Sequence, residues 1–195
     1  MGSGARRAGL APPLVLASSS PQRRAILERL GVPLTVRPVE IEELSSGDPA
    51  ALVTENALRK ARAGQAPGSQ ETVLGCDTIV VLDGVVFGKP ASEEVARQTL
   101  RALSDTTHEV LSGLVLLLGS VARRGLAHTR VTFRALGGDL IDWYLATGEW
   151  RGRAGGYAVQ GAGAALVRSV EGDYENVVGL PLATLLDLYP ELLSR

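Results

Sequence analysis

Three serines, a proline and two arginines stand together between Ser18 and Arg24, directly after a short apolar run. Ser20 suits the N-cap of a helix, and Pro21 suits its first position. The start of a helix offers unpaired backbone N–H groups and the positive end of the helix dipole, and hydroxyl and guanidinium groups add further donors. The stretch therefore fits a site for a phosphate or a chain of phosphates. It also fits a capped helix whose arginines are simply solvated.

A single carboxylate, Asp77, interrupts a second apolar run, which predicts a strand over residues 73–82. Nearly all of its neighbours are apolar, so we expect this strand to be buried on both faces. A buried carboxylate is costly unless a cation or hydrogen bonds satisfy it, and such an acid beside a phosphate site is typical of functional sites. The alternative is that Asp77 caps a local turn after Gly75.

The dipeptide Asp83-Gly84 lies between two β-branched runs and predicts a hairpin. With a two-residue loop, Thr78 lies across from Lys89, so Asp77 and Lys89 occupy the same end of the hairpin. Their side chains fall nominally on opposite faces, so the pattern predicts proximity and not a contact.

Further charged residues precede this hairpin. A helix predicted over residues 49–62 has inward positions at three- and four-residue spacing, and Lys60 is among them. A lysine there either extends its ammonium group to solvent or points into a site. The adjacent acids Glu42 and Glu43 fit either a solvated loop or a carboxylate ligand for a hard divalent cation.

Gln160 lies in a third distinctive stretch, residues 149–163, which is rich in glycine. Glycine lets the backbone approach a ligand closely, and the Gln160 amide can both donate and accept hydrogen bonds, which suits the edge of a nucleobase. The alternative is a flexible loop that binds nothing.

Two other reactive residue types carry no such pattern. Cys76 is the one cysteine, which excludes an internal disulfide and fits a reducing compartment. In an apolar strand its thiol is expected to be buried and inert. His108 has polar neighbours and no partner at metal-ligand spacing, which favours a position at the surface or in a turn.

Length and charge limit the classes of protein. The 195 residues suffice for one sizeable core, and a net charge of −1 gives no whole-chain electrostatic case for binding nucleic acid or an anionic membrane. No apolar stretch approaches the roughly 20 residues of a membrane span. We therefore expect a cytoplasmic protein with a flexible leader over residues 1–13, a single domain over 14–195, and no nucleic-acid or membrane partner.

Strands and helices are interspersed along the chain, which indicates an α/β domain built on a mixed sheet. The predicted helices cover residues 21–30, 49–62, 93–103, 140–147 and 180–193. Besides the second strand of the hairpin, the predicted strands cover residues 14–16, 33–39, 73–82, 109–118, 128–136 and 164–170, with a loop over 119–125 and a turn over 171–174.

Taken together, these motifs resemble the Maf family of nucleoside triphosphate pyrophosphatases. The matching stretches follow the family's order and spacing and are residues 16–24, 75–80 with 88–90, 156–161 and 171–182. The resemblance implies an inosine-triphosphatase-like fold, an elongated mixed β-sheet with flanking helices in two lobes around a cleft. It also implies hydrolysis of a nucleoside triphosphate to the monophosphate and pyrophosphate, with a divalent metal cation (Mg²⁺ or Mn²⁺), in a homodimer.

The resemblance further assigns roles to single residues. It implies that Asp77 is the proton acceptor that activates water, and that Glu42 is the metal-site acid, with Asp77 sharing the metal. The implied triphosphate cradle consists of Ser18, Ser20, Arg23, Lys60 and Lys89. The positions linked to the choice of base are Gln22, Thr78 and Gln160. The Tyr-Ala-Val-Gln-Gly form of the third motif resembles the branch that acts on dTTP and UTP.

Two departures from the family pattern affect these expectations. Gln22 stands where many members carry arginine, so the cradle loses one charge. Arg153 stands where the family usually has lysine, which keeps the charge with a different geometry. The alternative function is a nucleotide-binding regulator of cell division without catalysis, and the physiological role of the enzyme would be division arrest or cleansing of the nucleotide pool. A P-loop NTPase is disfavoured, because no Gly-Lys-Ser/Thr follows a strand.

Overall fold

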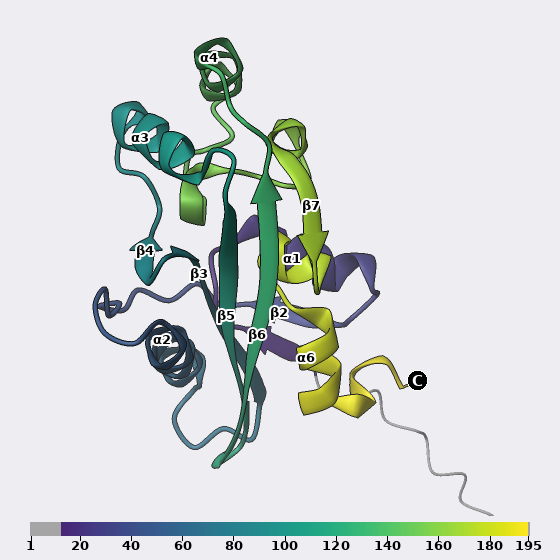
Figure 1. The fold of residues 1–195 in the computed structure, drawn as a ribbon. Coiled ribbons are helices and arrows are strands. Elements are labelled where there is room, and N and C mark those ends of the chain that lie inside the picture. The colour runs from purple at the N-terminus through teal and green to yellow at the C-terminus, as the bar shows by residue number, and fades with distance from the viewer. Residues whose placement is uncertain (1–12, 195) are drawn as a thin grey trace, which may run out of the picture.

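Residues 13–194 are described by the computed structural model, and a mixed β-sheet forms their centre (Figure 1). The strand order is β2-β1-β3-β5-β6-β7, with β4 paired to β3. The strands are β1 (Leu14–Leu16), β2 (Leu34–Val36), β3 (Thr72–Leu82), β4 (Val85–Phe87), β5 (Thr107–Leu118), β6 (Val121–Phe133) and β7 (Val167–Glu171). The helices are α1 (Pro21–Arg29), α2 (Pro49–Gly64), α3 (Glu93–Leu103), α4 (Gly138–Ala146), α5 (Tyr174–Val178) and α6 (Leu182–Leu188), with 3₁₀ turns η1 (Ala154–Gly156), η2 (Ala162–Leu166) and η3 (Pro190–Leu193). The expected mixed α/β sheet with flanking helices is confirmed.

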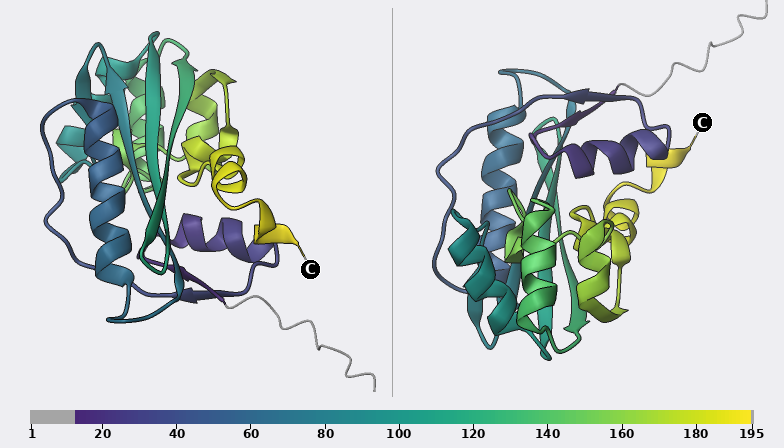
Figure 2. Two further views of the ribbon diagram at one scale, coloured as in Figure 1. Left: turned by 90° about the horizontal axis from the view of Figure 1, so that it is seen from below. Right: turned by 90° about the horizontal axis from the view of Figure 1, so that it is seen from above.

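Helices cover both faces of the sheet near its first strands, with α2 on one face and α1 and α6 on the other (Figure 2). Side chains alternate along β3, so Val73 packs with Ala57 on α2, while Leu74 packs with Ile26 on α1. Both faces of this strand are buried, which explains its nearly continuous apolar sequence.

Two glycines let α2 lie directly on the sheet. A Cβ atom at Gly75 would lie 2.2 Å from the carbonyl oxygen of Ala57, and one at Gly113 would lie 2.4 Å from that of Val53. No larger side chain fits at either position without moving the helix. This close approach brings the inward side chains of α2 beside the middle of β3, where Asp77 lies.

A second group of elements packs around the other end of the long strands β5 and β6 (Figure 1). Here α3, α4, η1 and η2 contribute to a core that contains Leu100, Phe133, Tyr144 and Leu166. The long strands therefore connect two packed groups of helices.

Local rules correctly predicted several boundaries. Ser20 is the N-cap of α1 and accepts a hydrogen bond from the backbone N–H of Arg23, and Pro21 opens the helix. The Asp83-Gly84 dipeptide joins β3 to β4 as a two-residue loop, with positive φ angles of 50° and 77°. Positive φ at both central residues is the geometry that suits the twist of a hairpin.

The expected loop over residues 119–125 is wrong. β5 and β6 pair from Leu118 and Val121 onward, so only Gly119 and Ser120 make the turn. Residues 121–124 are exposed, and an exposed strand edge accepts the polar side chains that suggested a loop.

The last part of the chain also departs from expectation. The strand predicted over residues 164–170 begins only at Val167, after η2, and the turn expected at Tyr174 opens the short helix α5. The helix predicted over 180–193 ends at Leu188, because Pro190 cannot continue it and a 3₁₀ turn follows.

The leader expected over residues 1–13 lies outside the described residues except for Pro13, and the single domain over 14–195 stays a prediction. Within residues 13–194, none of the helices combines the length and the apolar character that crossing a membrane requires.

Candidate active site

The candidate site lies where one edge of β3 loses its neighbours. β1 pairs with β3 at Val73 and Leu74, and β4 pairs with it from Val80 onward. Among residues 13–194, no strand pairs with that edge of β3 between these positions, and a cavity of about 320 Å³ opens there. Its lining includes nine of the residues expected in the site: Ser18, Ser20, Gln22, Arg23, Lys60, Asp77, Thr78, Lys89 and Gln160.

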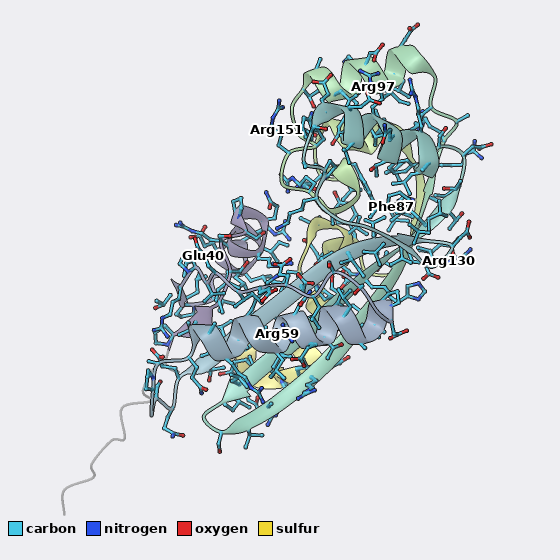
Figure 3. All side chains as sticks on the ribbon, turned by 90° about the vertical axis from the view of Figure 1, so that its left-hand side faces the viewer. Glu40, Arg59, Phe87, Arg97, Arg130 and Arg151 are labelled. Atoms are coloured by element: carbon cyan, nitrogen blue, oxygen red, sulfur yellow. The ribbon has the colours of Figure 1, made fainter. Side chains whose placement is uncertain are left out.

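Both packed groups of the molecule contribute to this cavity. Figure 3 shows the segment of Glu40 in the group that contains α2, and Arg151 in the group that contains α3 and α4. Glu43, three residues after Glu40, lines the cavity, and so does Arg153, two residues after Arg151. A ligand in the cavity would therefore touch both groups.

Asp77 lies in the middle of β3, with its side chain only 8% exposed. The Lys60 ammonium donates to Asp77 Oδ1 over 2.6 Å, and the Asn56 amide donates to Asp77 Oδ2 over 3.1 Å. The alternative that Asp77 caps a local turn is wrong, because the strand continues on both sides of it. The ammonium group and the amide thus satisfy both oxygens of the buried carboxylate.

Lys60 joins this carboxylate to a second one. Its ammonium group lies 2.6 Å from Oε1 of Glu43 as well as 2.6 Å from Oδ1 of Asp77, and its side chain is 10% exposed. The Glu43 side chain is 46% exposed, so this end of the ion pair faces the open part of the cavity. The prediction that Lys60 lies on the inward side of its helix is confirmed.

Asn56 is a buried polar residue whose place in the site sequence reasoning missed. Its Oδ1 accepts from the backbone N–H of Leu44 over 2.8 Å, and its Nδ2 donates to the carbonyl of Leu44 over 3.1 Å and to Asp77. One amide therefore fixes both the Asp77 carboxylate and the segment that carries Glu43. The available signal was its position four residues before Lys60, on the same face of α2.

Arg23 connects α1 to three other parts of the site through its guanidinium group. Its Nε donates to the Gly179 carbonyl over 2.9 Å, one terminal nitrogen donates to Ser18 Oγ over 3.2 Å, and the other donates to Thr78 Oγ1 over 3.1 Å. The neighbouring Arg24 is exposed and pairs with Glu28 four residues on. Of the two arginines in the motif, only Arg23 lines the cavity.

Lys89 lies just after β4, and Cys76 lies next to Asp77 in β3. Lys89 lines the cavity and an adjoining one of about 400 Å³, and Asp77 lines both. Cys76 is buried, and burial raises the pKa of its thiol, which is what an inert cysteine requires.

The glycine-rich stretch supplies the opposite wall. Tyr157 and Gln160 both line the cavity. The backbone N–H of Ala158 donates to the Tyr144 hydroxyl over 3.0 Å, and that of Gly163 donates to Glu149 Oε2 over 3.3 Å. Gln160 therefore lies on a segment that side chains hold on either side of it.

His108 contradicts the expected position at the surface or in a turn. It is fully buried in β5, its Nε2 lies 2.9 Å from the Tyr157 hydroxyl, and its ring packs edge-on against Phe133. Burial lowers the pKa of His108 to about 4 and raises that of Tyr157. The expectation failed because β5 begins at Thr107, which makes His108 an inward position of a strand.

The carboxylates that face the cavity are those of Asp77 and Glu43. Glu42 is exposed and does not line the cavity, and its carbonyl accepts from Arg59 over 3.2 Å. Within the described part of the chain, no group of three or more His, Cys, Asp and Glu side chains could hold a metal by itself. Mg²⁺ commonly binds one or two carboxylates together with substrate phosphates and water, so this pair fits a metal site that a phosphate ligand completes.

Comparisons with known proteins identify a family and relatives that this chain resembles. A family model described as Maf-like protein matches residues 13–192. The dTTP/UTP pyrophosphatase of Pyrococcus furiosus is 44% identical over 90% of this chain and 93% of its own length, and that of Moorella thermoacetica is 48% identical over 90% and 92%. Among solved structures, the Ham1 protein of Staphylococcus aureus aligns over 62% of this chain and 71% of its own, with 17% identity and a TM-score of 0.46.

Proposed function

The chain belongs to the Maf-like protein family, and from this premise we propose that it hydrolyses nucleoside triphosphates to the nucleoside monophosphate and pyrophosphate. Several relatives are named dTTP/UTP pyrophosphatase, which supports dTTP and UTP as the substrates. The observation that carries the proposal is the buried Asp77 carboxylate, held by Lys60 and Asn56 in a cavity that also contains Arg23 and Lys89.

The triphosphate binds at the start of α1. The Ser18 and Ser20 hydroxyls, the Arg23 guanidinium and the Lys89 ammonium all line the cavity there. Arg23 is fixed by three hydrogen bonds, so its charge is held in place before a ligand arrives. Fixed cations of this kind stabilise the negative charge that develops on phosphate oxygens during transfer.

Asp77 acts as the general base. A water oxygen forms a bond to the α-phosphorus while its proton passes to the Asp77 carboxylate, and the bond from the α-phosphorus to the oxygen bridging to the β-phosphate breaks. That oxygen leaves with the pyrophosphate, whose charge the lysines and Arg23 offset. Asn56 holds the carboxylate in one orientation, which general-base catalysis requires.

A divalent cation, Mg²⁺ or Mn²⁺, is part of the proposal. Asp77 and Glu43 are the residues of this cavity that would hold it, and Glu42 remains the acid that the family resemblance predicts. When bound, the cation would supply Lewis-acid neutralisation of phosphate oxygens.

The base lies toward the glycine-rich wall. Gln160 presents an amide there, and Gln22 and Thr78 line the same cavity from α1 and β3. The Thr78 hydroxyl is already held between Arg23 and Ser112, over 3.1 Å and 2.7 Å. We propose that these three residues set the preference for pyrimidine nucleotides.

A homodimer, a cytoplasmic location, a single catalytic domain and the absence of a nucleic-acid partner complete the proposal. Light scattering of the purified protein tests the first of these. A monomer at micromolar concentration would contradict it.

Hydrolysis itself is tested with a panel of nucleotides in Mg²⁺ and, separately, in Mn²⁺. We expect stoichiometric pyrophosphate and monophosphate, with dTTP and UTP turned over fastest. Release of inorganic phosphate alone, or no turnover of any nucleotide, would overturn the proposal. Tight nucleotide binding without hydrolysis would instead support the regulator of cell division.

A further inference from the structure

The carboxylates of Glu43 and Asp77 both pair with the ammonium group of Lys60. Lys60 Nζ lies 2.6 Å from Glu43 Oε1 and 2.6 Å from Asp77 Oδ1. These are the same two side chains that fit a divalent metal. The ammonium group therefore stands between the oxygens that such a metal would bind.

A metal that enters this arrangement must compete with the ammonium group. The side chains of Lys60 and Asp77 are only 10% and 8% exposed, so solvent screens their attraction weakly. Displacing Lys60 from both carboxylates would leave its charge buried and unpaired, which is costly. The affinity of the free enzyme for a divalent cation is reduced by that cost.

Asn56 fixes the Asp77 carboxylate and the backbone beside Glu43. Asn56 binds Asp77 Oδ2 and also both backbone groups of Leu44, the residue next to Glu43. The Asn56 amide thus connects β3 to the loop that carries Glu43. The competition between ammonium and metal therefore takes place at a fixed Asp77 carboxylate.

A triphosphate changes this balance. Lysine has a flexible stem and three donors, so its ammonium group can turn from carboxylate to phosphate oxygens within the same cavity. We propose that Lys60 is a resident counter-ion that keeps divalent metal from binding tightly until a triphosphate gives the ammonium group a new partner. This inference rests on the proposed function for the identity of the ligand. The competition between lysine and metal, however, belongs to the free protein.

The test measures Mn²⁺ binding without nucleotide, by electron paramagnetic resonance or calorimetry. We expect Lys60→Met to bind Mn²⁺ about tenfold or more tightly than the unaltered protein, the size of an ordinary coupling between two ligands. Lys89→Met is the matched control, because it removes the same charge from the same cavity, and in the described part of the chain Lys89 forms no ion pair with either carboxylate. Its Mn²⁺ affinity should change less than about threefold.

Further variants test whether Mn²⁺ binding depends on a cation between the two carboxylates or on the total charge of the cavity. Lys60→Arg keeps a cation between the carboxylates and should stay close to the unaltered protein, and Lys60→Met with Glu43→Gln should lose the gain. An unchanged affinity in Lys60→Met, or an equal gain in Lys89→Met or Lys60→Arg, would overturn the proposal. If Lys60→Met does not fold by circular dichroism, Lys60→Gln is measured in its place under the same criteria. No nucleotide is present, so this result and the pyrophosphate assay can fail independently.

Discussion

The two walls of the cavity are built by different means. The charged wall, which consists of Arg23, Lys60 and Asp77, is held by ion pairs and charge-assisted hydrogen bonds between α1, α2 and β3. The glycine-rich wall, residues 149–163, is held by two neutral hydrogen bonds, between His108 and Tyr157 and from Ala158 to Tyr144. Its one charge-assisted bond, from Gly163 to Glu149, is long at 3.3 Å. Charge-assisted bonds are roughly twice as strong as neutral ones, so the first wall is the stiffer of the two.

This difference matches the tasks proposed for the two walls. Attack on phosphorus requires a base and cations in fixed positions, because small displacements of reacting groups are costly. Discrimination between bases depends on a few weak hydrogen bonds whose contributions are individually small. Changes in the charged wall should therefore affect turnover, and changes in the glycine-rich wall should affect stability and selectivity.

The largest effect is expected for Asp77→Asn. Loss of the general base should lower kcat by about a thousandfold, while the dissociation constant of a non-hydrolysable UTP analogue changes little. Asp83→Asn is the matched control, because it makes the same change six residues on, at an exposed turn where asparagine tolerates the positive φ. Retention of turnover to within about tenfold in Asp77→Asn would show that Asp77 is not the base.

The next effect concerns His108, which contacts Tyr157 in the glycine-rich wall. Burial lowers the pKa of His108 from 6.5 to about 4, so folded His108 stays neutral while the unfolded chain takes up a proton below about pH 6.5. This contribution to the free energy of unfolding is present above pH 6.5 and is lost as the pH falls through about 4. It amounts to about 3 kcal/mol over that interval.

Urea unfolding of His108→Gln at about pH 7 and about pH 4 tests this contribution. The variant should lose less free energy of unfolding between the two conditions than the unaltered protein does. His128→Gln is the control, because His128 is the other histidine and its side chain is 47% exposed. Equal losses in His108→Gln and in the unaltered protein would contradict the buried neutral histidine.

The motif that contains Arg23 shows how far sequence reasoning reaches. The cap at Ser20, the first helical position of Pro21 and the two-residue turn at Asp83-Gly84 follow from rules that act within a few residues, and all three are confirmed. The inward position of Lys60 follows from helical periodicity in the same way. These rules cannot say which of two adjacent arginines points into a cavity.

The positions that sequence reasoning could not predict depend on contacts between distant segments. Glu42 and Glu43 lie in a loop without periodicity, and Glu43 faces Lys60 because Asn56 fixes the backbone at Leu44. His108 was expected at the surface because its flanking residues are polar. Those polar residues lie at the start of β5, whose alternation buries His108 beneath Tyr157.

A smaller effect is expected when Arg23 and Arg24 are each replaced by lysine. Lysine at position 23 keeps the charge but cannot reach Gly179, Ser18 and Thr78 at once, so Arg23→Lys should raise KM for UTP by about tenfold. Arg24→Lys alters an exposed pair with Glu28, and such pairs contribute little. Steady-state kinetics of both variants checks this, and equal effects would mean that Arg23 has no special role in the cradle.

The smallest effect is expected for Glu149→Gln, on the glycine-rich wall. Glu149 accepts one long hydrogen bond from Gly163, and its carboxylate fills the space where a Cβ at Gly161 would lie 2.5 Å from Oε1. Glutamine keeps the shape and loses the charge, so the segment of Gln160 should loosen without collapsing. We expect the ratio of kcat/KM between UTP and CTP to change by about two- to fivefold, since a single weak hydrogen bond is affected, with kcat for UTP preserved. Glu171→Gln, an exposed acid that pairs with Arg130 on the sheet, should leave the ratio as it is. A fall in kcat as large as that of Asp77→Asn would mean that both walls take part in the reaction itself, and the division of labour between them would not hold.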